Sequence, residues 1–298
     1  MASNKYYAGI VARGVAMGAA DVVPGVSGGT IAFITGIYDT LIDSLKAFGP
    51  SALQILWKEG PGPAWRYVNG SFLLALFSGI ALSILTLANA IDYALTHHPV
   101  LLSAFFFGLI LASAVLIYRQ IPAADRGIVM VVPGVVFALA VSLIRPGELP
   151  VNYLTVFCSG AVAICAMILP GISGSFILLI LGMYGPVIAA IKNLEFATLA
   201  VFALGCGTGL MLFVRLLSWL LHRHRHGLLQ FLTGLLLGSL AIIWPWKAET
   251  PVIQGVNWYN VWPWHYQGSF SADLPLAILL ALVGVAIIWL IERAALER

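Results

Sequence analysis

Charged residues are scarce in this sequence, and their scarcity excludes an ordinary soluble domain. Asp, Glu, Lys and Arg together make up 9% of the 298 residues, whereas soluble domains carry about 25%. Hydrophobic residues make up 61%. Lys and Arg exceed the acidic residues by only three, which is too slight an excess to indicate a nucleic-acid partner. The composition therefore predicts a polytopic membrane protein.

Cysteine and several familiar catalytic motifs are also lacking. The three cysteines, Cys158, Cys165 and Cys206, lie in apolar stretches without C-x-x-C spacing, so we interpret them as packing residues. No G-x-x-x-x-G-K-[ST] and no H-E-x-x-H occurs, which argues against a built-in ATPase or a zinc hydrolase. We therefore expect a protein that is not an enzyme and that has no cofactor and no metal site.

One polar stretch of the chain has a second copy. Residues 21–30 read D-V-V-P-G-V-S-G-G-T, and residues 169–176 read L-P-G-I-S-G-S-F, at an offset of 146. When residues 13–46 are aligned with 159–192, twelve of thirty-four positions are identical. Proline followed by glycine does not continue a helix well, because the ring removes a donor and clashes with the preceding turn. Each copy therefore predicts an apolar helix, a break at Pro-Gly-x-Ser-Gly and a second helix that begins at the break.

The duplication extends to two halves of the chain, residues 1–148 and 149–298. Each half has one broken element followed by three apolar stretches long enough to span a membrane. The broken elements cover 8–48 and 153–191, and the predicted spans are 71–91, 99–118, 127–144, 196–221, 227–246 and 274–291. Three crossings per half turn the second copy upside down. The predicted fold class is thus an all-α polytopic membrane protein with an inverted-topology repeat.

The positive charges test this topology. Each arm of a broken element reaches only about 20 Å, short of the roughly 30 Å hydrocarbon core, which favours a re-entrant hairpin. With re-entrant hairpins and a cytoplasmic N-terminus, eleven Lys and Arg lie inside and three outside; if each broken element crossed once, the tally would be seven against seven. Since cytoplasmic loops carry the excess of Lys and Arg, we predict re-entrant hairpins and cytoplasmic termini. Residues 49–70 then form an interfacial loop inside, and the aromatic loop 247–273 lies outside.

The two breaks are candidate anion sites. A helix that begins at a break presents free N–H groups and the positive end of its dipole, which suits a phosphate or a carboxylate. Two such tips, entering from opposite faces, would meet near the midplane of the membrane. The predicted phosphate-binding residues are the glycines and hydroxyl residues of the breaks: Gly25, Ser27, Gly28, Gly29, Thr30, Gly171, Ser173, Gly174 and Ser175. An unusual packed turn is the alternative interpretation of the same pattern.

Three charged residues lie near the breaks in the sequence. Arg13 and Arg215 are candidate phosphate contacts, and for each the alternative is a side chain that extends to the membrane surface. Asp21 precedes the first break, while the equivalent position of the second copy holds Met167. Burial favours the neutral form of a carboxyl group, so Asp21 is a candidate for proton coupling. The alternatives for Asp21 are a pair with Arg13 or a cap on freed backbone groups.

These motifs resemble one bacterial family of membrane proteins. The resemblance rests on residues 18–30, on Gly36-Ile37-Tyr38, and on residues 169–175 followed by Gly182-Met183-Tyr184. It includes Gly234-Leu-Leu-Leu-Gly-Ser239 and Trp244-Pro-Trp246 as well. The family, once a domain of unknown function, comprises polyprenyl-phosphate translocases. The resemblance spans nearly the whole chain.

The resemblance implies a function that the residues alone do not name. It implies a flippase that returns undecaprenyl phosphate, the lipid carrier of cell-wall synthesis, from the outer to the inner leaflet of the bacterial cytoplasmic membrane. The expected partners are this lipid and membrane lipids, and the sequence leaves the oligomeric state open, a homo-oligomer included. The competing hypotheses are a transporter of a small soluble anion and an intramembrane lipid phosphatase or transferase.

Overall fold

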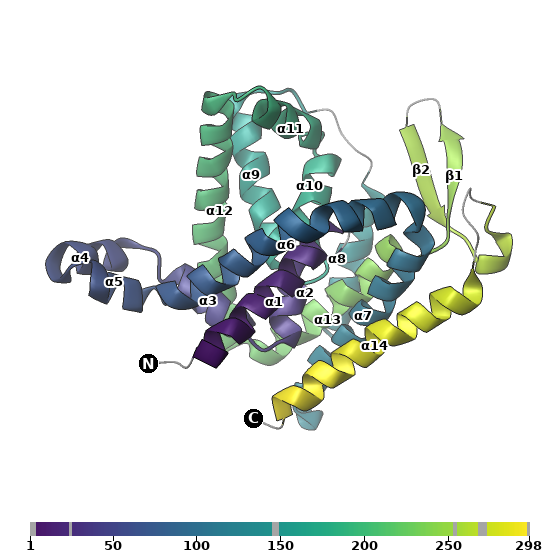
Figure 1. Cartoon of the computed structure of the whole chain (residues 1–298), viewed down its shortest axis with the longest axis horizontal. Coiled ribbons are helices and arrows are strands. Elements are labelled where there is room, and N and C mark those ends of the chain that lie inside the picture. The colour runs from purple at the N-terminus through teal and green to yellow at the C-terminus, as the bar shows by residue number, and fades with distance from the viewer. Residues whose placement is uncertain (1–3, 24–25, 145–148, 253–254, 268–272, 297–298) are drawn as a thin grey trace. The chain divides into compact units, whose positions relative to one another are not determined.

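Helices dominate the chain. The computed structural model describes residues 4–23, 26–144, 149–252, 255–267 and 273–296 (Figure 1). Its α-helices are α1 (Asn4–Val22), α2 (Gly28–Ile34), α3 (Tyr38–Lys46), α4 (Pro50–Glu59), α5 (Pro61–Tyr67), α6 (Gly70–His97), α7 (Pro99–Arg119), α8 (Val131–Leu143), α9 (Tyr153–Ile168), α10 (Gly174–Ile180), α11 (Tyr184–Lys192), α12 (Phe196–Arg223), α13 (Arg225–Ile243) and α14 (Leu274–Leu296). Two short 3-10 helices, Ala123–Asp125 and Pro263–His265, lie in loops.

Among the described residues, five helices are long and apolar enough to cross a membrane. These stretches are Gly70–Leu87, Pro99–Arg119, Phe196–Arg223, Arg225–Ile243 and Leu274–Arg293. They match the predicted spans 71–91, 99–118, 196–221, 227–246 and 274–291, because long apolar runs without charges can satisfy their backbone only as helices in lipid. The protein is therefore a multi-pass membrane protein.

The prediction of a membrane span over residues 127–144 is wrong, because the helix there is too short. The helix there, α8, has only 13 residues and begins at Val131, so it reaches about 20 Å, well short of a membrane core. The preceding residues form a loop that includes the 3-10 helix Ala123–Asp125. Arg126 in this loop donates hydrogen bonds to the carbonyls of Arg119 and Ile121.

The all-α prediction needs one addition. In the predicted outer loop 247–273, strands β1 (Lys247–Val252) and β2 (Gly255–Asn260) pair antiparallel, with Lys247 opposite Asn260. A two-stranded hairpin is marginally stable by itself. Trp246, directly before β1, packs in a buried cluster with Val100, Ala104 and Ala277, which ties the hairpin to the helices.

The two broken elements contain the same succession of helices. In each, a long helix (α1 or α9) ends before the Pro-Gly pair, a seven-residue helix (α2 or α10) begins after it, and a nine-residue helix (α3 or α11) follows. The prediction of one continuous second arm is wrong, because Gly36 and Gly182 break that arm with φ of 72° and 69°. Only glycine adopts such angles readily. The chain bends by 108° between helices α10 and α11.

The described chain divides into two compact units. Unit 1 comprises residues up to Leu85 together with Leu143–Leu228, and unit 2 comprises Thr86–Ser142 together with the residues from Leu229 onward. Each unit thus takes elements from both predicted halves, 1–148 and 149–298. The division into two inverted halves stays a prediction.

Close helix crossings hold unit 1 together. A Cβ added at Gly14 of α1 would lie 2.2 Å from the Leu76 carbonyl of α6, and one at Gly79 would lie 2.2 Å from the Val11 carbonyl. Helices α9 and α12 cross in the same way, since a Cβ at Gly205 would lie 2.1 Å from the Phe157 carbonyl. Small residues at such crossings let helix backbones approach closely in membranes. Figure 1 shows α9 and α12 side by side.

The helices of unit 2 also approach each other closely at glycines. Helix α7 packs on α14 through Gly108 and Gly284, and α8 packs on α13 through Gly134 and Gly234. At each of these glycines an added Cβ would lie within 2.3 Å of a backbone carbonyl oxygen of the neighbouring helix. Both broken elements lie in unit 1, so the predicted anion site belongs to that unit alone.

Candidate functional site

The first break is capped by the chain itself. Helix α2 begins at Gly28, and the Gly28 N–H donates to Asp21 Oδ1 at 2.6 Å. The Gly29 N–H donates to Ser27 Oγ at 3.1 Å, and the Thr30 N–H donates to the Ser27 carbonyl at 2.9 Å. The first three amides of α2 are therefore satisfied. Asp21 takes the capping role among its predicted alternatives, and among the described residues no ion pair joins it to Arg13.

The second break lacks this carboxylate. Helix α10 begins at Gly174 with Ser173 as its N-cap, and the Ser173 side chain makes no capping hydrogen bond. Instead, Ser173 Oγ and Ser175 Oγ hydrogen bond to each other at 2.8 Å. Met167, at the position equivalent to Asp21, carries no acceptor that could replace a carboxylate. The two tips are thus chemically different: one holds an internal anion and the other does not.

The two breaks contact each other. The Ser27 hydroxyl donates to the Met167 carbonyl at 3.0 Å, and the Tyr38 hydroxyl donates to the Ile168 carbonyl at 3.3 Å. Both carbonyls belong to the last turn of α9, which ends before Pro170 and so leaves acceptors without helical partners. A Cβ at Gly29 would lie 2.5 Å from the Ile168 carbonyl oxygen. Within unit 1, the first tip therefore satisfies backbone groups that the second break frees.

Thr30 has an unpaired hydroxyl next to this contact. Its side chain is fully buried, and within the described part of the chain its Oγ1 has no hydrogen-bond partner. A buried hydroxyl without a partner costs folding free energy. The unpaired hydroxyl of Thr30, in the first turn of α2, is therefore a candidate contact for a ligand.

Two predicted site residues need separate mention. Gly25, together with Pro24, lies outside the described residues. Gly171 has φ of 87° in the turn between α9 and α10 and is buried there, like Gly174. Gly171 thus shapes the second break through its backbone.

The two arginines lie on the long helices α1 and α12. Arg13 is half-buried on α1, and Arg215 is exposed on α12, where its Nη1 donates to the Met211 carbonyl at 3.3 Å. A Cβ at Gly49 would lie 3.2 Å from Arg215 Nη2, which places the guanidinium beside the loop after α3. No hydrogen bond links either arginine to the described residues of the two breaks in this conformation.

A polar network that the sequence analysis did not predict joins α3 to α12. The buried Ser218 hydroxyl donates to Asp43 Oδ1 at 3.0 Å and accepts from Lys46 Nζ at 3.1 Å. One turn away on α3, Asp39 pairs with Arg225 at 2.7 Å. The residues of α3 offered only a weak signal, the spacing of charges at 39, 43 and 46 on one helix face.

Tyr38 was also missed as a site residue, although its identity with Tyr184 in the repeat was a usable signal. Tyr38 is 2% exposed, and its ring packs against Phe33 with centroids 5.0 Å apart. Tyr184 is 43% exposed. Equivalent tyrosines thus have different surroundings: Tyr38 reaches the end of the opposite long helix, and Tyr184 is partly exposed.

The letters of the first break also fit the G-x-S-x-G pattern of serine hydrolases, as Gly25-Val-Ser-Gly-Gly29. In those enzymes the serine lies exposed on a strand-to-helix turn beside a histidine base. Ser27 is buried between two helices, and its hydroxyl proton is directed at the Met167 carbonyl. The geometry is that of a structural hydrogen bond and not of a nucleophile.

Known proteins resemble this chain over most of its length. The family model described as undecaprenyl phosphate translocase-like matches residues 17–257, which include both breaks. The chain is 46% identical over 297 residues to a polyprenyl-phosphate transporter of Vibrio cholerae, with 95% of each chain covered. It is 30% identical over 257 residues to a polyprenyl-phosphate transporter of Staphylococcus aureus, with 79% of this chain and 85% of the relative covered.

No solved structure matches the chain. The family model covers far more than half of the sequence, and the match to the Vibrio cholerae relative extends over almost the whole length of both proteins. The chain therefore belongs to the undecaprenyl phosphate translocase-like family.

Proposed function

We propose that this protein is a lipid translocase that carries undecaprenyl phosphate from the outer to the inner leaflet of the bacterial cytoplasmic membrane. The family, and relatives that are named transporters and not enzymes, support the substrate class. The observation that carries the site is the hydrogen bond from Ser27 to the Met167 carbonyl, which joins the two breaks within unit 1.

The chemistry of the lipid explains why such a site is needed. A phosphate monoester carries about −1.5 to −2 charges near neutral pH. Such a headgroup does not cross hydrocarbon unaided, because nothing there replaces its hydration. The polyprenyl tail can remain in lipid during transport, so only the headgroup has to pass through the protein.

The second tip is the place where the phosphate binds first. One hydrogen bond joins the hydroxyls of Ser173 and Ser175, and it uses the proton of only one of them. The other can be donated to an anion, and the N–H groups at the start of α10 lie beside it. Gly171 and Gly174 give the backbone its close approach at this break.

The first tip binds the phosphate only after Asp21 has lost its negative charge. The carboxylate already occupies the Gly28 N–H, so it repels a second anion and competes for the same donor. Protonation of Asp21 removes the repulsion and weakens its hold on the Gly28 N–H, which would couple headgroup movement to a proton. Gly25, Ser27, Gly28, Gly29 and Thr30 supply the contacts of this tip, and Arg13 and Arg215 meet the headgroup as it moves to the inner leaflet.

Headgroup flipping in proteoliposomes tests the proposal. The vesicles contain undecaprenyl phosphate, and the fraction of headgroups accessible to a soluble phosphatase is followed over time. Loss of both hydroxyls in Ser173→Ala/Ser175→Ala removes hydrogen bonds to a charged group, so we expect a fall in rate of about tenfold or more. The matched control is Thr208→Ala, whose hydroxyl bonds only the Leu204 carbonyl within α12.

Two results would contradict the proposal. One is a double variant that flips the lipid as fast as the control. The other is rapid uptake of inorganic phosphate by wild-type vesicles without lipid flipping, which would make the protein a transporter of a soluble anion.

A further inference from the structure

A short helical hairpin follows the broken element in the first half of the chain. Helices α4 (Pro50–Glu59) and α5 (Pro61–Tyr67) lie between α3 and α6, and Figure 1 shows them side by side. At the equivalent place in the second half, only residues 193–195 separate α11 from α12. The hairpin is therefore an addition that the duplicated architecture does not require.

Helix α4 has an apolar face that is largely exposed. None of its residues is buried, and the side chains of Leu53, Leu56 and Trp57 are 61%, 42% and 87% exposed. Positions 53, 56 and 57 lie on one side of a helix. An exposed apolar face of this kind is a binding surface in a soluble setting and an insertion surface beside a membrane.

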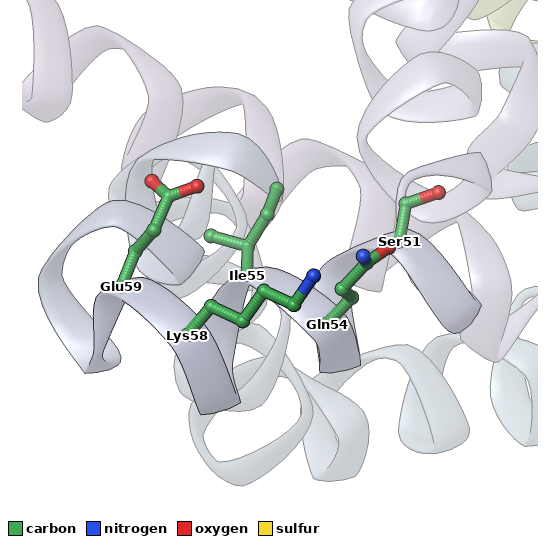
Figure 2. Close-up of a pocket in the computed structure, with 5 residues that line it drawn as sticks. All are labelled: Ser51, Gln54, Ile55, Lys58 and Glu59. Atoms are coloured by element: carbon green, nitrogen blue, oxygen red, sulfur yellow. The ribbon is translucent and has the colours of Figure 1, made fainter.

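The other face of α4 is polar. Ser51, Gln54, Lys58 and Glu59 line a pocket of about 380 Å³ together with Ile55, and Figure 2 shows these side chains along one helix. The pocket is formed by α4 residues and lies outside the two breaks. Lys58 lies on this polar face, about 100° around the helix axis from its neighbour Trp57.

Helix α5 is fixed to the beginning of a membrane span. Trp65 Nε1 donates to Ser71 Oγ of α6 at 3.0 Å, and a Cβ at Gly70 would lie 2.4 Å from the Trp65 ring. The stretch of α6 that is apolar and long enough to cross a membrane begins at Gly70. Helix α5, which ends at Tyr67, therefore lies directly before this apolar stretch, and α4 packs beside it.

The side chains of the hairpin suit that depth. Trp57, Trp65 and Tyr67 are exposed, and Trp and Tyr concentrate at the level of the lipid headgroups. Lys58 of α4 and Arg66 of α5 supply two cations in the same hairpin, and cations near a membrane surface favour anionic lipids.

We infer that the α4–α5 hairpin is a membrane-surface anchor: Leu53, Leu56 and Trp57 insert between the headgroups of one leaflet, and Lys58 and Arg66 bind anionic lipids of that leaflet. The anchor holds the end of the first broken element, α3, at the surface of the leaflet. This inference does not depend on the proposed function, because it concerns bulk lipid and not the transported one.

Depth-dependent quenching tests the anchor in the full-length protein. A fluorescent label is attached at Trp57→Cys or, as the matched polar-face control, at Ser51→Cys, in a variant whose three native cysteines are replaced by serine. The protein is reconstituted in phosphatidylcholine vesicles with or without phosphatidylglycerol. We expect nitroxide-labelled lipid to quench the label at 57 more than the label at 51, and aqueous iodide to show the reverse order.

Other patterns would overturn the inference. Iodide quenching of equal strength at both positions would place the apolar face in water. Protection of the label at 57 from both quenchers would mean that protein, such as a second copy of the chain, covers the face. If the cysteine-free variant does not fold, quenching of intrinsic fluorescence by brominated lipid in wild type and in Trp57→Phe replaces the label, and an equal quenched fraction in the two proteins would refute insertion.

The lipid preference has its own control. Quenching of the label at 57 by nitroxide lipid should increase when phosphatidylglycerol is added, and Lys58→Gln/Arg66→Gln should abolish that increase while leaving insertion into neutral vesicles intact. An increase that survives in the double variant would refute the role of the two cations.

Discussion

The hydroxyl of Ser27 donates a hydrogen bond to the carbonyl of Met167, 140 positions away in the chain. The same hydroxyl oxygen accepts the Gly29 N–H, so a single side chain both caps α2 and completes the last turn of α9. Ser173, its equivalent in the second copy, does not cap α10, and among the described residues its hydroxyl bonds only Ser175. The two copies are therefore alike in sequence and different in what they stabilise.

The first prediction compares these two serines. Ser27→Ala leaves a carbonyl and an amide without partners in a buried place, which should lower the free energy of unfolding by about 1–3 kcal/mol. Ser173→Ala loses only a bond to Ser175 and should cost less. Thermal unfolding of both variants in the same detergent measures the difference. Equal midpoints for the two variants would show that the Ser27 contact does not stabilise the fold.

The second prediction concerns the close approach at Gly29. Gly29→Ala places a Cβ 2.5 Å from the Ile168 carbonyl oxygen, so α2 has to move away from α9 at a cost of about 1–3 kcal/mol. Gly185→Ala is the control, because an added Cβ there meets nothing within 4 Å. Folded yield and unfolding temperature should fall for the first variant only. A normal Gly29→Ala protein would mean that the two breaks separate easily.

The third prediction separates the charge of Asp21 from its capping role. Asp21→Asn keeps an oxygen that can accept the Gly28 N–H, so the variant should fold with nearly unchanged stability. Asp21→Ala loses the cap and should be less stable by about 1 kcal/mol. If protonation of Asp21 is coupled to transport, Asp21→Asn should also flip lipid at a rate that no longer depends on pH. The flipping assay between pH 6 and pH 9 decides this, and an Asn variant with the wild-type pH profile would exclude Asp21 as the coupling group.

The fourth prediction ranks two polar contacts of α3, one with α12 and one with α13. The Asp39–Arg225 pair is about half exposed on both sides, and pairs of this kind contribute less than about 1 kcal/mol. Ser218 is fully buried between Asp43 and Lys46, so Ser218→Val should destabilise the protein more than Asp39→Asn. Chemical denaturation at low and high salt checks the ranking, and only the Asp39 effect should decrease with salt.

The fifth prediction is a pH dependence at the β1–β2 hairpin. Lys247 Nζ donates to the Ala241 carbonyl and to Asn260 Oδ1, and burial lowers the pKa of Lys247 from 10.5 to about 8. Below pH 8 the amine is charged in both folded and unfolded chains, and the cost of burying its charge is present in full. Between about pH 8 and 10.5 the folded form alone loses its proton, so this group makes the folded state relatively more stable as pH rises.

Lys247→Met provides the comparison for this effect. The unfolding temperature of wild type minus that of Lys247→Met should increase as the pH is raised from 7 to 10. A difference that stays constant over this range would contradict the lowered pKa.

Much of the fold could be predicted because its signals are local. Five of six predicted spans appear as helices of suitable length, since a long uncharged run admits one structure in lipid. The sixth, 127–144, was predicted from its apolar character alone, and its helix α8 begins only at Val131. The second breaks, at Gly36 and Gly182, had a signal in the shared glycines, but a single glycine inside an apolar run is also compatible with a continuous helix.

The sequence by itself determined where helices break and which stretches are apolar, because proline, glycine and long uncharged runs act on their own backbone. Only the tertiary structure decided that Asp21 caps Gly28, that Tyr38 reaches Ile168 while Tyr184 stays exposed, and that Ser218 lies between Asp43 and Lys46. These partners are set by which helices pack together and how each is rotated about its axis. That information is spread over the helix contacts of unit 1 and is not contained in any one segment.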